Sequence, residues 1–103
     1  MTYGTALKAL ASGTRRSLFE RVAEQPLSVG QLADEFRISQ PAVSQHLKVL
    51  REARLVDLER RGARHIYRAN PEGIEALRRY LDQFWDGVLN AFADATKPED
   101  KNT

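Results

Sequence analysis

The 103-residue sequence is 42% apolar and 29% charged, which suits one small domain with a modest core and excludes most two-domain architectures. It has no cysteine, so disulfides, thiolate metal sites and cysteine nucleophiles are excluded. The formal net charge is only +2, but residues 37–68 carry eight Lys or Arg against three Asp or Glu. This basic middle favours a polyanionic partner, the alternative being a solvated basic face. No apolar run could span a membrane and no charged-then-apolar leader opens the sequence, so we expect a cytoplasmic protein.

Two short helices are predicted at the start of the chain. Tyr3, Leu7 and Leu10 have the spacing of one helix face. The segment 12–14 then interrupts the pattern and offers Thr14 as the N-cap of a second helix, which Pro26 ends. The apolar residues of this second helix keep helical spacing; they are Leu18, Phe19, Val22 and Ala23.

A pair of helices joined by a short turn is predicted next. Ser28 is a suitable N-cap for a helix over residues 29–36. Ser39 is a suitable N-cap for the following helix, and Pro41 falls in its first turn, where the missing N–H breaks no helical hydrogen bond. The apolar residues of each helix lie on one side; they are Val29, Leu32, Ala33 and Phe36, and then Ala42, Val43, Leu47 and Leu50. Two helices joined by so tight a turn form a helix-turn-helix.

The pattern then changes from helical to extended. Two apolar runs flank a charged tip over residues 59–64, in which Gly62 can adopt the positive φ that a hairpin turn needs. These runs contain Leu55, Val56, Leu58, Ile66 and Tyr67. We therefore predict a two-stranded wing after the helix-turn-helix.

Asn70 and Pro71 begin a long last helix with an apolar stripe wider than a small domain normally covers. The stripe consists of Ile74, Leu77, Leu81, Phe84, Trp85, Val88, Leu89 and Phe92. We expect a second copy of the chain to cover it, through an interface formed by Leu7, Leu10, Phe84, Trp85, Val88, Leu89 and Phe92. The alternative is that these side chains fill the core of the monomer.

The predicted fold is thus mainly α with a small β-hairpin, a winged helix-turn-helix that dimerises through its first and last helices. We expect residues 1–95 to form one winged helix-turn-helix domain for DNA binding and dimerisation. Residues 96–103 have the polar, proline-containing composition of a flexible C-terminal tail.

The helix that begins after Ser39 has the chemistry of a major-groove reader. Such a helix anchors one apolar side in the domain and presents donors and acceptors near its N-terminus. Glutamine can pair with adenine through two hydrogen bonds, and serine can donate to a phosphate or a base. The candidate DNA contacts are Ser39, Gln40, Pro41, Ser44, Gln45, His46 and Lys48. The alternative is that Ser39 is only a cap and that Ser44 and Gln45 are only solvated, while His46 could bond the backbone or reach a phosphate.

Three arginines at the wing tip are the remaining candidate DNA contacts. Arg60, Arg61 and Arg64 could enter the flanking minor groove or bind phosphate, and a guanidinium group suits both uses. The alternative is an exposed hairpin that its charge keeps soluble.

From Leu10 to Tyr67 the sequence resembles the ArsR/SmtB winged-helix repressors of bacteria. The segments that carry the resemblance are LASGTRR at 10–16, PLSVGQLA at 26–33, SQPAVSQHL at 39–47 and RGARHIY at 61–67. The resemblance implies a homodimer that binds a near-palindromic double-stranded DNA operator and represses transcription.

Several positions depart from the family pattern. Where the metal-sensing branch has two cysteines, this sequence has Ser28 and Gly30, and the last helix carries Asp82 and Asp86 but no histidine. The chain therefore resembles a branch without metal sites, and we expect no cofactor. Arg54 stands where the family usually has glycine, so either Arg54 adopts the left-handed conformation or the preceding helix ends differently.

These features favour a metal-independent, sequence-specific transcriptional repressor. The runner-up is a winged helix that binds an acidic protein instead of DNA. An enzyme is excluded because the sequence offers no nucleophile with a base and an orienting group, and no phosphate-binding glycine loop. An unidentified small-molecule effector could bind beside Tyr80 and Trp85, although aromatic side chains on such a stripe usually serve packing.

Overall fold

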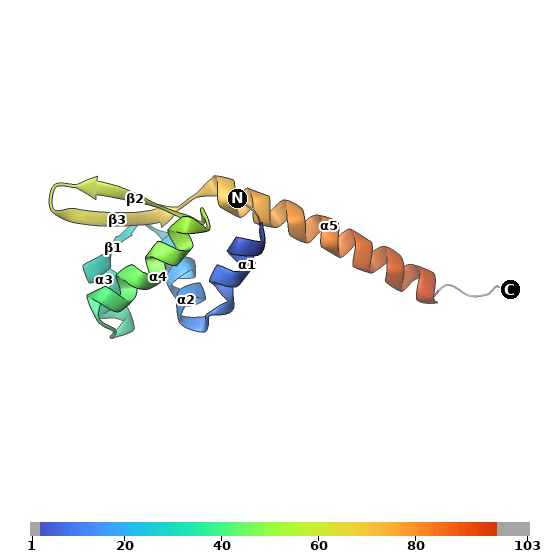
Figure 1. Ribbon diagram of the computed structural model, residues 1–103, viewed down its shortest axis with the longest axis horizontal. Coiled ribbons are helices and arrows are strands. Elements are labelled where there is room, and N and C mark those ends of the chain that lie inside the picture. Colours follow the sequence, from blue (N-terminus) through green and yellow to red (C-terminus); the bar gives the residue numbers. More distant parts are fainter. Residues whose placement is uncertain (1–2, 97–103) are drawn as a thin grey trace, which may run out of the picture.

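The computed structural model describes residues 3–96 of the chain, as a small body from which one long helix extends (Figure 1). In chain order the elements are α1 (Tyr3–Ala11), α2 (Gly13–Glu24), β1 (Leu27–Ser28), α3 (Val29–Phe36), α4 (Gln40–Glu52), β2 (Val56–Arg61), β3 (Arg64–Ala69) and α5 (Pro71–Thr96). The predicted tail, apart from Thr96, lies outside the described residues. The mainly helical fold with a small β-hairpin is confirmed.

The turn between α1 and α2 differs from the prediction. Ser12, not Thr14, is the N-cap of α2, because Ser12 has extended backbone angles and its hydroxyl accepts a hydrogen bond from the Arg15 N–H at 3.2 Å. The inward side of α1 also differs, since Ala6 and Ala9 are buried while Leu7 is 39% exposed. Leu10 is half-buried and packs against the core.

The helix-turn-helix forms as predicted. Ser28 caps α3 and exchanges two hydrogen bonds with Gln31, a capping box that satisfies both N–H groups. Ser39 caps α4 by accepting a hydrogen bond from the Ala42 N–H at 3.1 Å. Between the helices, Arg37 adopts the left-handed conformation with φ of 56°. The inward residues of α4 are fully buried; they are Val43, Leu47 and Leu50.

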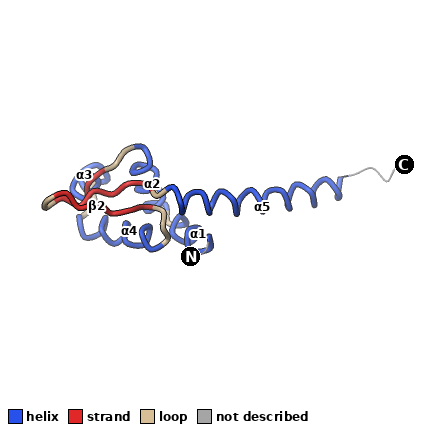
Figure 2. The backbone as a smooth tube through the Cα atoms, turned by 90° about the horizontal axis from the view of Figure 1, so that it is seen from above, coloured by secondary structure: helices blue, strands red, loops and turns tan. Residues whose placement is uncertain are grey.

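The sheet has three strands, in the order β1-β3-β2, and not only the two of the predicted wing. The added strand β1 is two residues long and pairs Leu27 with Tyr67 and Ser28 with Ile66. Figure 2 shows β2 and β3 running together to the tip, away from α5. Gly62 turns this hairpin with φ of 60°, as predicted.

A tight backbone contact joins the segment between α4 and β2 to α5. Arg54, after α4, adopts the left-handed conformation with φ of 61°, the first of the two predicted alternatives. The buried Gly73, in the first turn of α5, lies against it, and a Cβ built on Gly73 would come within 1.8 Å of the Arg54 carbonyl oxygen. Only glycine therefore allows α5 to leave the body at this angle.

Replacing Arg54 by glycine should raise the free energy of unfolding by about 1 kcal/mol, because glycine adopts the left-handed conformation without a steric cost from Cβ. Urea denaturation would measure the change. Arg51→Gly, at an exposed helical position of α4, is the control and should lower it by about 0.5 kcal/mol. An Arg54→Gly variant less stable than the parent chain would contradict the prediction.

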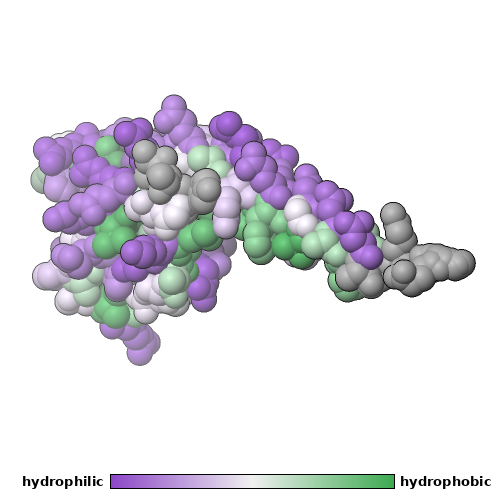
Figure 3. Space-filling model, turned by 45° about the vertical axis from the view of Figure 1, so that its right-hand side comes forward, coloured by the Kyte–Doolittle hydropathy of each residue, from purple (hydrophilic) through white to green (hydrophobic). Residues whose placement is uncertain are grey.

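Beyond its first turns, α5 leaves the body and exposes an apolar face. Ile74 and Leu77 still pack against the core, but from Leu81 onward the described side chains are exposed. Figure 3 shows the hydrophobic side chains gathered along one side of α5. We call this surface the α5 face; its exposed residues are Leu81, Phe84, Trp85, Val88, Leu89 and Phe92. The alternative that they fill the core of the monomer is wrong, since Trp85 is 58% and Phe92 65% exposed. Among the described residues, no helix is long and apolar enough to cross a membrane.

Candidate nucleic-acid interface

The first two turns of α4 present a polar surface opposite the buried side of the helix. Because Val43 and Leu47 anchor α4 in the core, Ser44 and Gln45 between them point outward. Six of the seven candidate contacts on this segment are exposed: Ser39, Gln40, Pro41, Ser44, Gln45 and Lys48. These side chains are therefore free to contact bases in a major groove. The Ser39 hydroxyl also caps the helix, by accepting a hydrogen bond from the Ala42 N–H.

His46, the seventh candidate on α4, is half-buried. Its Nδ1 atom is buried and has no hydrogen-bond partner within the described part of the chain. The backbone hydrogen bond that was one alternative for His46 is therefore not made through Nδ1.

The three wing arginines are all exposed, but their surroundings differ. Arg61 Nε donates to Glu59 Oε2 at 2.8 Å, and Glu59 also accepts from Arg68. The hydrogen bond from Arg61 holds the pKa of Glu59 below its usual value, and the charges of Arg61 and Arg68 act in the same direction. Glu59 therefore offsets part of the charge of Arg61, whereas over residues 3–96 it forms no ion pair with Arg60 or Arg64.

This role of Glu59 was not predicted from the sequence. The sequence could have predicted the pairing of Glu59 with Arg61. Residues two apart on a strand point to the same side of a sheet, which places these two side chains next to each other. The pairing with Arg68 depends on strand register and could be found only from the structure.

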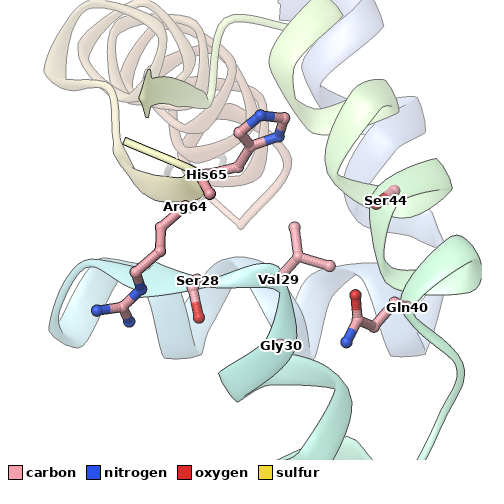
Figure 4. A pocket seen from close by; sticks show the side chains of 8 residues that line it. Ser28, Val29, Gly30, Gln40, Ser44, Arg64 and His65 are labelled. Atoms are coloured by element: carbon pink, nitrogen blue, oxygen red, sulfur yellow. The ribbon is translucent and has the colours of Figure 1, made fainter. Parts of the chain in front are cut away.

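A groove lies between the wing tip and the starts of α3 and α4 (Figure 4). We call it the wing groove; its volume is about 390 Å³, and its lining residues are Ser28, Val29, Gly30, Gln40, Ser44, Ala63, Arg64 and His65. It brings three predicted DNA contacts, Gln40, Ser44 and Arg64, to one place. His65 and the start of α3 were not predicted to take part. The alternation of β3 places His65 on the same side as the buried Tyr67, which is the side that faces the helices.

The positions at which the family can carry metal ligands hold other residues here. Ser28 is buried as a helix cap and Gly30 has no side chain, so neither can supply a thiolate. Asp82 and Asp86 are exposed on α5. Over residues 3–96, no group of three His, Asp or Glu side chains is arranged to hold a metal ion.

Comparisons with known proteins agree on one class. Residues 12–57 match the family model described as "Bacterial regulatory protein, arsR family". The chain is 49% identical over 98 residues to the HTH-type transcriptional regulator Rv2034 of Mycobacterium tuberculosis, which aligns 95% of this chain with 92% of that protein. It is 31% identical to the arsenical resistance operon repressor of Staphylococcus xylosus, over 76% of this chain and 75% of that protein.

A solved structure with a similar fold supports the same class. It is described as the crystal structure of a "Possible transcriptional regulator for arsenical resistance". The TM-score is 0.71 and the sequence identity 40%, and the match covers 88% of this chain and 96% of that one.

Proposed function

Because this chain belongs to the ArsR family of bacterial regulatory proteins, which bind DNA and are not enzymes, we propose that it is a homodimeric repressor of a near-palindromic operator, acting in the cytoplasm. The observation that carries this proposal is that the polar surface of α4 and the arginine-bearing wing tip border the same groove. One molecule can therefore present a helix to a major groove and a hairpin to the neighbouring minor groove.

The α5 face supports the homodimer. Six large apolar side chains lie exposed along it, a larger apolar surface than a small monomer usually presents to water. Leu7 is exposed on α1, which packs against α5, and would extend the interface. Leu10 is half-buried in the chain itself and would contribute less. A twofold pair built this way would place its two α4 helices in successive major grooves about 34 Å apart.

The individual residues take roles that follow from their chemistry. On α4 the side chains that would read bases or bind phosphate are Ser39, Gln40, Ser44, Gln45 and Lys48, with Pro41 and His46 at the edge of the surface. On the wing, Arg60 and Arg64 would bind phosphate or the minor groove. Arg61 would first have to break its hydrogen bond with Glu59.

The signal that releases the repressor would not be a metal bound by thiolates. Two of the similar proteins are named for arsenical resistance, whereas this chain has no cysteine to bind a soft metal. An organic effector beside Tyr80 and Trp85 stays a prediction. The Tyr80 and Phe84 rings stack there with centroids 6.2 Å apart.

A gel shift tests the proposed function directly. The probes would be inverted repeats from the DNA upstream of the gene that encodes this chain, with an unrelated duplex as competitor. We expect a complex that survives excess unrelated duplex. Failure to bind any of these repeats at low salt would refute the proposal.

Two single substitutions should separate base reading from phosphate binding. Arg64→Ala should weaken binding to all operator variants alike and reduce the slope of log K against log salt by about 0.9 for each phosphate that is no longer neutralised. Gln45→Ala should instead change which base is preferred, with discrimination falling about tenfold at one position. Competition among single-base operator variants would measure both effects. An equal loss on every variant for Gln45→Ala would refute its assignment as a base reader.

A further inference from the structure

The wing groove lies where a DNA strand would have to pass. The major and minor grooves of a duplex are separated by one sugar–phosphate strand. If α4 occupies the major groove and the wing the adjacent minor groove, that strand crosses between α4 and the wing tip. The wing groove occupies this place, since its lining comes from the start of α4 on one side and from the wing tip on the other.

The lining has the chemistry of an anion site. Figure 4 shows Arg64 extending from the wing towards the start of α3, while the His65 ring and the Gln40 amide border the space from opposite sides. Ser44 adds a hydroxyl donor, and none of the eight described lining residues is acidic. The start of α3 adds the positive end of a helix. Ser28 already accepts from the Gln31 N–H, and the Val29 and Gly30 N–H groups have no acceptor within the helix.

We propose that the wing groove binds one phosphodiester of the strand that separates the two DNA grooves. This assigns phosphate contacts to His65 and to the start of α3 at Gly30, in addition to Arg64. The inference rests on the proposed DNA binding and deepens it. The contact is independent of base sequence, because every nucleotide carries the same phosphate.

Gly30 allows a direct test. A Cβ built on Gly30 would lie 3.8 Å from Gln40 Nε2 and 3.9 Å from Ser28 Oγ, so a side chain fits there at ordinary contact distance and enters the groove. Gly30→Asp would place a carboxylate where the phosphate binds. The same substitution should leave α3 as stable or more stable, because an acidic residue in the first turn suits the helix dipole and glycine is a poor helix former.

The experiment compares variants for binding to a labelled duplex of unrelated sequence and for thermal unfolding. We expect Gly30→Asp to weaken binding about tenfold through charge repulsion, with an unchanged or higher melting temperature. Gly30→Asn has nearly the same shape without the charge, and should stay within about twofold of the parent chain. Gly13→Asp adds the same charge at the start of α2 and should also stay within about twofold. Apart from its chain neighbours and the adjoining helix backbone, no described atom lies within 4 Å of a Cβ built there. His65→Ala should weaken binding to every duplex about fivefold.

The outcomes separate the phosphate site from the proposed function. If the parent chain binds no duplex even at low salt, the proposed function and the phosphate site are both wrong. If the parent chain binds and Gly30→Asp binds equally well, only the phosphate site is wrong. A loss with Gly13→Asp as large as that with Gly30→Asp would show an effect of net charge alone and would also overturn the site. So would an equal loss with Gly30→Asn, because bulk and not charge would then be responsible.

Discussion

Replacing Gly73 by alanine should lower the free energy of unfolding by about 3 kcal/mol, a large loss for a chain of this size. The new Cβ would lie 1.8 Å from the Arg54 carbonyl oxygen and 2.5 Å from its carbonyl carbon. Both are backbone atoms of a residue already held in the left-handed conformation, so no flexible side chain can move aside. Either α5 tilts away from the body, or the segment between α4 and β2 is displaced.

Gly87→Ala is the matched control for this prediction. Gly87 lies in the same helix, on the side away from the α5 face. Apart from its chain neighbours and the adjoining helix backbone, no described atom comes within 4 Å of a Cβ built there. Alanine at this position should raise the free energy of unfolding by about 0.8 kcal/mol through helix propensity. Urea denaturation of both variants at one protein concentration gives the comparison. If the two substitutions have the same effect, the contact with Arg54 does not constrain α5.

The double substitution Trp85→Glu with Leu89→Lys should convert the proposed dimer into a monomer. The parent chain is expected to show twice the mass of 11.7 kDa by light scattering at micromolar concentration, and the variant 11.7 kDa. Both residues are exposed on the α5 face, and charges there cannot be buried against a second copy without a large cost. Operator affinity should fall about a hundredfold, because the two half-sites would then be bound independently. A parent chain of 11.7 kDa would refute the dimer.

The control places the same charges on the other side of the helix. Gln83→Glu with Gly87→Lys keeps the spacing of four residues, which favours the ion pair within the helix equally in both variants. This control should keep the mass and operator affinity of the parent chain. Loss of the dimer in the control would show that charge anywhere on α5 disrupts assembly, and the α5 face would lose its assignment.

The sequence predicted most of the features whose determining interactions are local. The caps at Ser28 and Ser39 were predictable, because a hydroxyl bonds an N–H three residues later and an apolar period follows each serine. The hairpin turn at Gly62 was predictable for the same reason, since the turn itself requires a positive φ. The candidate contacts on α4 followed from the helical period once its buried side was known.

The sequence did not predict features that depend on contacts with distant parts of the chain. The two residues of β1 are too short for an alternating pattern, and they form a strand only because β3 lies beside them. The requirement for glycine at position 73 comes from Arg54, nineteen positions earlier, through a backbone contact that no local pattern records. The wing groove likewise combines three separate segments. At the α1–α2 turn, two hydroxyls were available and the choice of Ser12 over Thr14 depended on where the helix begins.

The joint at Gly73 gives α5 the mechanics of a lever. From Gly73 to Phe92 the helix is about 28 Å long, so a tilt of about 5° at the joint displaces the far end by about 2.5 Å. In a dimer built on the α5 face, that displacement would move both α4 helices and change the distance between them. The half-site separation that the dimer can bind would then depend on the stiffness of the contact between Gly73 and the Arg54 carbonyl, far from any base.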